Sequence, residues 1–145
     1  MVKVTAALKT LLKQSGICVD EFCNQFIKWK NAGEYSSYYF GKDSAYVAPT
    51  VDGEKYKLRH VHLVPLIDQK QLAVWNKKWQ FGGRKTSDRV LIYVEDNRNN
   101  FLLIFILSEP DAHKIAQMKE LKHEQLMKRF ASVSEQFMFD GTILA

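Results

Sequence analysis

The sequence predicts an α+β fold in which helices flank a small, mostly antiparallel sheet. Two strands, 90–95 and 101–107, are separated by the polar turn DNRNN and are therefore expected to form a hairpin. The second of these strands is apolar on both faces, which favours a place inside the sheet. Apolar residues at helical spacing before and after the hairpin predict the flanking helices.

The first fifteen residues show two conflicting periods. Apolar residues alternate over 2–8, which favours a strand that ends before the Ser15-Gly16 pair. The spacing of Leu8, Leu11 and Leu12 equally suits the buried face of a helix.

Capping residues and glycines predict where the next helices and strands begin and end. Asp20 is expected to cap a helix that carries a Phe/Trp face and stops at Gly33. Residues 34–53 are rich in Ser, Gly, Asp and Tyr and are expected to form a loop. A strand is expected over 57–66, and a short amphipathic helix over 72–79, which the Gly82-Gly83 pair would break.

After the hairpin the sequence predicts two helical segments. Glu109-Pro110-Asp111 should open the first, with Ser108 as its cap and with Ile115, Met118 and Leu121 on its apolar face. The second shows apolar spacing from Leu126 to Phe137. With 145 residues, the chain is expected to form a single domain, 1–145. The sequence contains no membrane-length apolar run and no signal-peptide core, so we expect a cytoplasmic protein.

Positive charge is concentrated in residues 54–89. This stretch holds nine Lys/Arg and three Asp/Glu, a net +6, whereas the whole chain carries +5. His60, His62, Trp75, Trp79 and Phe81 lie within it. Cations interleaved with rings suit a polyanion with stackable bases, so RNA is the simplest candidate ligand.

His60 and His62 are the first candidates for chemistry. They lie two apart in an expected strand, so their side chains should share one face. Such a pair suits proton transfer at a phosphodiester. A metal site would need a third ligand from His113, His123 or an acid, and no complete ligand signature is present. The alternative is structural, with one ring buried and the other solvated.

His113 is expected in the first turn of its helix, where unpaired N–H groups bind phosphate and favour a neutral imidazole. It therefore suits a general base, although a surface histidine without a role is an equal alternative. The segment RKTSDR at 84–89 follows two glycines and combines cations with hydroxyls, which suits a phosphate, but a solvated turn is the alternative. Trp75 and Trp79 suit base stacking, although their spacing favours the core for at least one.

Six segments in order resemble the YafO family of bacterial toxins from type II toxin–antitoxin systems. They are FIKWK at 26–30, FGKDSAY at 40–46, HVHL at 60–63, QF with RKTSD over 80–88, LIY at 91–93, and LLIFIL with PDAHK over 102–114. The first strand and the tail after Met127 match loosely, and residues 50–55 depart from the family pattern.

The resemblance implies a fold similar to that of RelE-like toxins and a metal-independent endoribonuclease, an mRNA interferase that cuts translated mRNA on the ribosome. It also implies a cognate antitoxin as partner, and no cofactor is expected. Two alternatives stay open. One is a noncatalytic RNA- or ribosome-binding module, and the other is a toxin of the same fold with a different target, such as gyrase.

The matched positions and their chemistry assign the proton transfers to His62 and His113, with His60 as a substitute for either, and phosphate stabilisation to Arg84. The other candidate RNA or phosphate contacts are Arg59, Lys85, Thr86, Asp43, Tyr93, Lys114, Lys57, Lys77 and Lys78.

Overall fold

The computed structural model describes residues 1–145 and has the α+β architecture that the sequence predicts. No helix has both the length and the apolar character that a membrane crossing requires. The helices and strands of the protein, in chain order, are β1 (Val2–Val4), α1 (Ala6–Gln14), α2 (Val19–Ala32), β2 (Phe40–Ala45), β3 (Arg59–Leu63), α3 (Gln69–Gln80), β4 (Val90–Glu95), β5 (Phe101–Leu107), α4 (Ala112–Ala116) and α5 (Leu121–Asp140).

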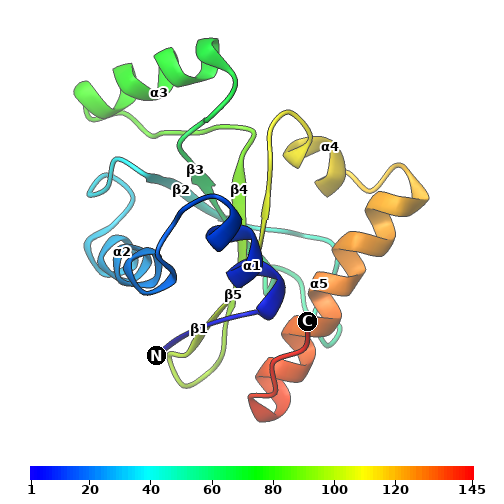
Figure 1. The fold of residues 1–145 in the computed structure, drawn as a ribbon. Coiled ribbons are helices and arrows are strands. Elements are labelled where there is room, and N and C mark those ends of the chain that lie inside the picture. The colour runs from blue at the N-terminus through cyan, green and yellow to red at the C-terminus, as the bar shows by residue number, and fades with distance from the viewer.

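The five strands form one sheet in the order β1-β5-β4-β3-β2 (Figure 1). All neighbouring strands are antiparallel except β1 and β5, which are parallel. The predicted hairpin is confirmed as β4 and β5, with the bounds expected from the sequence. β5 lies between two neighbours, and all but one of its residues are buried, as its two apolar faces predict.

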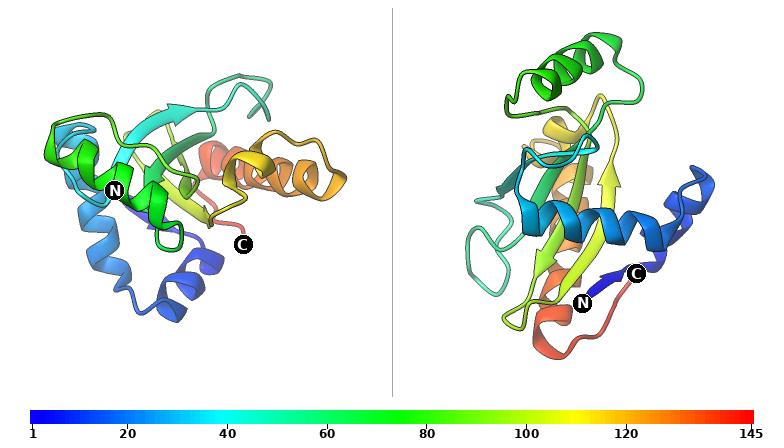
Figure 2. Two further views of the ribbon diagram at one scale, coloured as in Figure 1. Left: turned by 90° about the horizontal axis from the view of Figure 1, so that it is seen from above. Right: turned by 90° about the vertical axis from the view of Figure 1, so that its left-hand side faces the viewer.

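Each face of the sheet carries its own core. On one face, Leu91 and Tyr93 of β4 pack with Phe26 and Trp29 of α2. On the other, residues such as Ile92 join the apolar side of α5. Figures 1 and 2 show α1 and α2 on one side of the sheet and α5 on the other. Because side chains alternate along a strand, neighbouring residues of β3 and β4 face opposite layers.

The prediction that the first strand runs on toward Ser15 is wrong, and the helical alternative for this region is confirmed. β1 ends at Val4, and Thr5 caps α1. The Thr5 hydroxyl accepts a hydrogen bond from the Leu8 N–H at 3.2 Å and donates one to the Ile104 carbonyl at 2.6 Å. This side chain both starts the helix and ties it to β5, and Leu8 and Leu12 are then buried one turn apart.

Several further boundaries differ from the sequence expectation, and β3 covers only Arg59–Leu63 of the expected strand 57–66. α2 begins at Val19 after Cys18, so Asp20 lies in its first turn, although Gly33 ends the helix as predicted. α4 begins at Ala112 after Asp111 rather than after Ser108. Leu121 does not continue an apolar face, because it is 70% exposed at the start of α5.

The prediction of an unbroken loop over 34–53 is also wrong, because β2 occupies Phe40–Ala45. β2 is an edge strand of mixed polarity that pairs only with β3, so its sequence lacks the apolar pattern of a central strand. The register shifts between Phe40 and Asp43, which places a bulge at Gly41 and Lys42.

α3 includes the expected helix 72–79 and ends before the predicted Gly82-Gly83 break, but it begins earlier, at Gln69. Asp68 caps it by accepting the Lys70 and Gln71 N–H groups. Trp75 is its one buried residue, which confirms the core prediction for one of the two tryptophans. The Trp75 indole donates to the Tyr38 carbonyl at 2.8 Å, and the Lys85 ammonium lies 5.4 Å from its ring centroid.

Gly41 allows the segment after α3 to lie directly against β2. A Cβ at this position would collide with the Lys85 carbonyl oxygen and approach the Trp75 ring to 2.9 Å. With no side chain in the way, the Lys42 N–H donates to that carbonyl at 2.9 Å. The missing side chain is therefore required for the close packing of β2 with residues 85–88.

We expect Gly41→Ala to lower the free energy of unfolding by about 1–3 kcal/mol, because the new methyl group must displace backbone. Chemical denaturation measures the change. The matched control is Gly83→Ala, where a Cβ would meet mainly the flexible end of Lys78 and the cost should be small. Equal stability of the two variants would contradict this account of β2.

Candidate functional site

Three histidines from two elements lie in a row on one face of the sheet. His60 and His62 pair with Ile92 and Val90 of β4, so both point to the face that α5 covers, as the sequence predicts. Their ring centroids are 5.5 Å apart. The ring of His113, from α4, lies 6.0 Å from that of His62. The fold thus brings together imidazoles that are about fifty residues apart in the sequence.

His62 and His113 open into a cleft of ≈ 660 Å³ between β2, α3, α4 and the segment before β4. Lysines, hydroxyl groups and one carboxylate surround the two rings. Its lining residues are Lys42, His62, Lys70, Gln71, Val74, Thr86, Ser87, Asp88 and His113. A concave surface with positive charge and two imidazoles is suited to proton transfer on an anionic ligand.

His62 is 5% exposed and is held by the backbone of Ser87. Its Nδ1 lies 2.7 Å from the Ser87 carbonyl oxygen and 2.9 Å from the Ser87 nitrogen. Either neutral tautomer therefore has a partner at Nδ1, as donor to the carbonyl or acceptor from the N–H. Burial lowers the pKa of His62 to about 4, so the ring is neutral at pH 7.

Ser87 also joins the cleft to the sheet. Its hydroxyl lies 2.6 Å from the Leu63 carbonyl oxygen, to which it donates, and it accepts the Arg89 N–H at 3.2 Å. The Leu63 N–H in turn donates to the Arg89 carbonyl at 2.8 Å. These bonds fix residues 87–89 beside the end of β3, so the Ser87 contact with His62 is set by backbone geometry.

His113 is coupled to Asp88. Its Nδ1 lies 2.7 Å from Asp88 Oδ1, and its backbone N–H donates to the same oxygen at 2.7 Å. The Asp88 N–H donates to the Gln71 side chain at 2.9 Å, which ties the pair to α3. The His113 side chain is 66% exposed. With Nδ1–H donated to the carboxylate, Nε2 is the ring nitrogen directed to solvent and ligand.

His60 has a different environment from the other two rings. It stacks on Tyr46 with centroids 4.2 Å apart and planes 19° apart. Its Nδ1 is buried without a hydrogen-bond partner. Burial, with positive charge on His62 as a second cause, lowers the pKa of His60 to about 3. His60 does not line the cleft, so it lies behind His62 rather than beside a ligand.

Three of the candidate RNA contacts lie on the opposite face of the sheet. Asp43 pairs in register with Val61, and Arg59 with Tyr93, and these positions belong to the layer of α2. There the Asp43 carboxylate binds Lys30 at 2.7 Å and Arg59 at 3.1 Å, and it accepts the Tyr93 hydroxyl. Tyr93 is fully buried, so it is not retained as a candidate RNA contact.

Residues 27–139 match the family described as Toxin YafO, type II toxin-antitoxin system. The chain belongs to the YafO toxin family. This confirms the resemblance seen in the motifs and implies a cognate antitoxin as partner. The match includes every residue that lines the cleft, but no curated protein and no solved structure matches the chain.

The RKTSD segment of this YafO-family toxin divides among different environments. Arg84 is half-exposed, and its guanidinium binds Glu34 through two contacts of 2.9 and 2.8 Å. Lys85 is 1% exposed, with its ammonium over the rings of Trp75 and Trp79. Burial lowers the pKa of Lys85 and removes it from the cleft surface, so its assignment as a phosphate ligand is not retained. Thr86 lines the cleft.

Several cleft residues, among them Lys42 and Asp88, are not among the candidates that the sequence indicates. Lys42 lies beside Asp43 in the FGKDSAY segment, and the bulge in β2 turns Lys42 to the cleft side. Asp88 ends the RKTSD segment, and only the fold brings it to His113. The other predicted docking cations lie outside the cleft lining: Lys57 is half-buried near Glu54, whereas Lys77, Lys78 and Lys114 are exposed.

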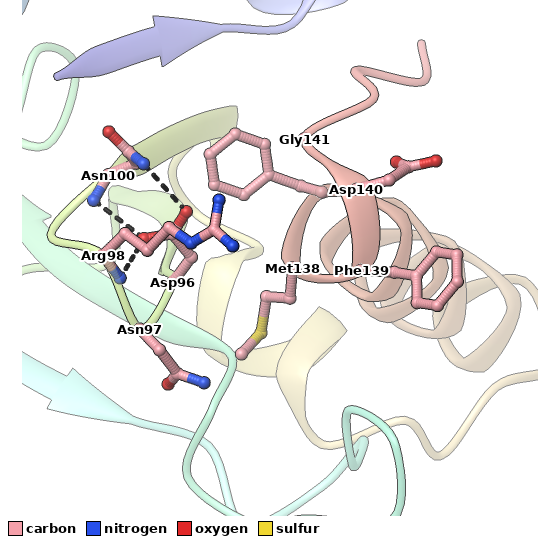
Figure 3. Close-up of a pocket in the computed structure, with 9 residues that line it drawn as sticks. Asp96, Asn97, Arg98, Asn100, Met138, Phe139, Asp140 and Gly141 are labelled. Atoms are coloured by element: carbon pink, nitrogen blue, oxygen red, sulfur yellow. Dashed lines mark hydrogen bonds between the residues drawn. The ribbon is translucent and has the colours of Figure 1, made fainter.

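A second cavity, of ≈ 420 Å³, lies between the β4–β5 turn and the end of α5 (Figure 3). It contains no histidine or lysine. Asp96 accepts the Arg98 and Asn100 N–H groups, so its carboxylate closes the turn rather than facing a ligand. No three His, Cys, Asp or Glu side chains in the structure are grouped in a way that would hold a metal ion. The imidazole cleft is therefore the candidate site.

The depressed pKa of His62 predicts a loss of stability in acid. The folded ring titrates near pH 4 and the unfolded one near 6.5, so the unfolded chain binds the extra proton as the pH falls through this window. Between pH 7 and pH 5, His62 alone should lower the free energy of unfolding by about 2 kcal/mol.

Urea denaturation at the two pH values measures this loss, and His62→Gln should reduce it because glutamine does not titrate. Thr86→Ala is the matched control, since it changes another cleft side chain without removing an ionisable group and should keep the pH dependence of the wild type. An unchanged pH dependence in His62→Gln would show that the buried imidazole is not its source.

Proposed function

We propose that this YafO-family toxin is a ribosome-dependent mRNA interferase, a metal-independent endoribonuclease that cuts translated mRNA by attack of the ribose 2′-OH. The observation that carries the proposal is the pairing of two imidazoles in one basic cleft. His62 is kept neutral by burial, and His113 is linked to the Asp88 carboxylate. A base and an acid are the two proton-transfer groups that this reaction requires.

His62 is suited to the role of base. It is neutral at pH 7, and when Nδ1–H donates to the Ser87 carbonyl, the lone pair of Nε2 is available. The 2′-OH gives its proton to this nitrogen while the 2′-oxygen forms a bond to phosphorus. The negative phosphate beside the ring favours the imidazolium that results. Ser87 holds the ring orientation during the transfer.

His113 is suited to the role of acid. Its Nδ1–H is directed at Asp88, which compensates the positive charge of the imidazolium. Nε2–H then gives its proton to the 5′-oxygen as the P–O5′ bond breaks. The products are a 2′,3′-cyclic phosphate and a 5′-hydroxyl end, and no atom other than those of the RNA and the two protons is exchanged. This division matches the geometry, in which one ring is enclosed and the other is exposed.

Charge on the phosphate is stabilised by cations that surround the rings. Lys42 and Lys70 line the cleft, and Thr86 adds a hydroxyl donor. Arg84 remains a candidate for the same role, provided that it exchanges Glu34 for a phosphate oxygen. The cleft is open, so the ribosome would supply much of the alignment of the mRNA. Exposed lysines such as Lys114 would add salt-dependent contacts with ribosomal RNA.

We expect His62→Ala and His113→Ala each to slow mRNA cleavage by about 100-fold or more, since each removes one proton transfer. Primer extension on a defined mRNA, in a translation reaction with purified ribosomes, measures the rate. The matched control is His123→Ala on α5, outside the cleft lining. Thermal melting establishes that each variant is folded.

Undiminished cleavage by folded His62→Ala, His113→Ala and Arg84→Ala variants would overturn the site assignment. Ribosome binding without cleavage by the wild type would favour a noncatalytic module. Toxicity that survives the His60→Ala, His62→Ala and His113→Ala substitutions would favour a different target, such as gyrase.

A substrate with sulfur in place of the bridging 5′-oxygen separates the two roles. A thiolate leaves without protonation, so the acid becomes unnecessary. On this substrate His113→Ala should cleave at a rate within about 10-fold of the wild type, whereas His62→Ala should stay slow. Rescue of His62→Ala instead would reverse the assignment of base and acid.

A further inference from the structure

One exposed face of α3 continues directly from the cleft. Lys70 and Val74 line the cleft, and residues at helical spacing from them, Lys77, Lys78 and Phe81, point to the same side of the helix. We call these five residues the α3 stripe. At 1.5 Å per residue it extends about 16 Å along the helix axis. Figure 1 and the right panel of Figure 2 show α3 at one end of the molecule, apart from the other helices.

The α3 stripe has the charge of a polyanion-binding surface. α3 contains three lysines and no acidic residue, and the one carboxylate at its start, Asp68, is engaged as the helix cap. The side chains of Lys77 and Lys78 are exposed and form no ion pair in the structure. Their charges therefore lack an internal partner, although they lie in the last turn, where the helix dipole favours cations.

The stripe also exposes apolar surface that packing does not explain. Val74 is 54% exposed and Phe81 is 78% exposed. The buried side of α3 is formed instead by Trp75, whose indole is bonded to the Tyr38 carbonyl. An exposed ring among lysines offers a flat surface for a base, with cations placed for the phosphates on either side.

We propose that the α3 stripe binds the single-stranded RNA that flanks the cleft, with Phe81 stacking on a base and Lys77 and Lys78 contacting phosphates. The inference rests on the proposed function for the direction of the strand, which passes from the cleft at Lys70 toward Phe81. A protein partner fits less well, because Lys77 and Lys78 separate the exposed apolar side chains of Val74 and Phe81 along the stripe.

Binding is separated from cleavage by a 2′-O-methyl RNA oligonucleotide, which has no free 2′-OH and is not cut. Fluorescence anisotropy of the labelled oligonucleotide measures affinity over a series of salt concentrations. Phe81→Ala should weaken binding by about 10-fold through loss of stacking, and Phe81→Trp should restore it. Lys77→Gln/Lys78→Gln should reduce the slope of log affinity against log salt by about 1.4, the value for two phosphate contacts on a single strand.

The chain offers matched controls for both changes. Phe139→Ala removes another ring that is 83% exposed, and Lys9→Gln/Lys13→Gln removes two exposed lysines from α1, both away from the cleft. These variants should bind the oligonucleotide with nearly the affinity and slope of the wild type, the lysine pair changing only through net charge. Equal losses in the control and α3 variants would overturn the proposal in favour of nonspecific attraction.

If Phe81→Ala and Lys77→Gln/Lys78→Gln bound the oligonucleotide as tightly as the wild type, the proposal would also be overturned. Weaker binding of these variants to ribosomes would not rescue it, because the stripe would then recognise a ribosomal surface. The test is independent of the reaction. If the protein bound the oligonucleotide through the stripe but cut no mRNA, the proposed cleavage would be rejected and the proposed RNA binding by the α3 stripe would stand. If the protein cut mRNA but did not bind the oligonucleotide through the stripe, the proposed cleavage would stand and the proposed RNA binding by the stripe would be rejected.

Discussion

The candidate site depends on the backbone attachment of residues 85–89 to the ends of β2 and β3. The Lys85 carbonyl accepts from Lys42, the Ser87 hydroxyl donates to Leu63, and Ser87 holds the His62 ring. These contacts involve main-chain atoms on at least one side, so they are specified by the path of the chain more than by long side chains. They also bring Asp88 within reach of His113, so that His62 of β3 and His113 of α4 are held at one cleft.

The sheet separates two sets of charged groups that the sequence places side by side. Arg59 and His60 are neighbours, as are Lys42 and Asp43, yet one member of each pair lies in the layer of α2 and the other in the layer of α5. On the α2 side, the pKa of Asp43 is lowered: burial opposes this, but hydrogen bonds from Lys30 and Tyr93 outweigh it. That network is internally satisfied, which suits a role in holding β2 to α2 rather than in binding RNA.

Features that follow from strand and helix periods were predictable from the sequence. The β4–β5 hairpin and the shared face of His60 and His62 are examples, because alternation needs no knowledge of distant contacts. Features created by long-range contacts were not predictable. Lys85 looked like a phosphate ligand until the fold placed two indole rings over its ammonium. β2 was missed because an edge strand with a bulge carries little apolar pattern.

The small buried surface of α3 has a consequence for the free energy of local unfolding. α3 buries only Trp75, whereas nearly all of β5 is buried, so α3 should detach at a lower free energy than the sheet unfolds. Its amide protons should exchange with solvent faster than those of β5. A segment that opens independently would leave the cleft without one wall while β3 and its histidines stay folded, and a ligand bound along α3 would suppress that opening.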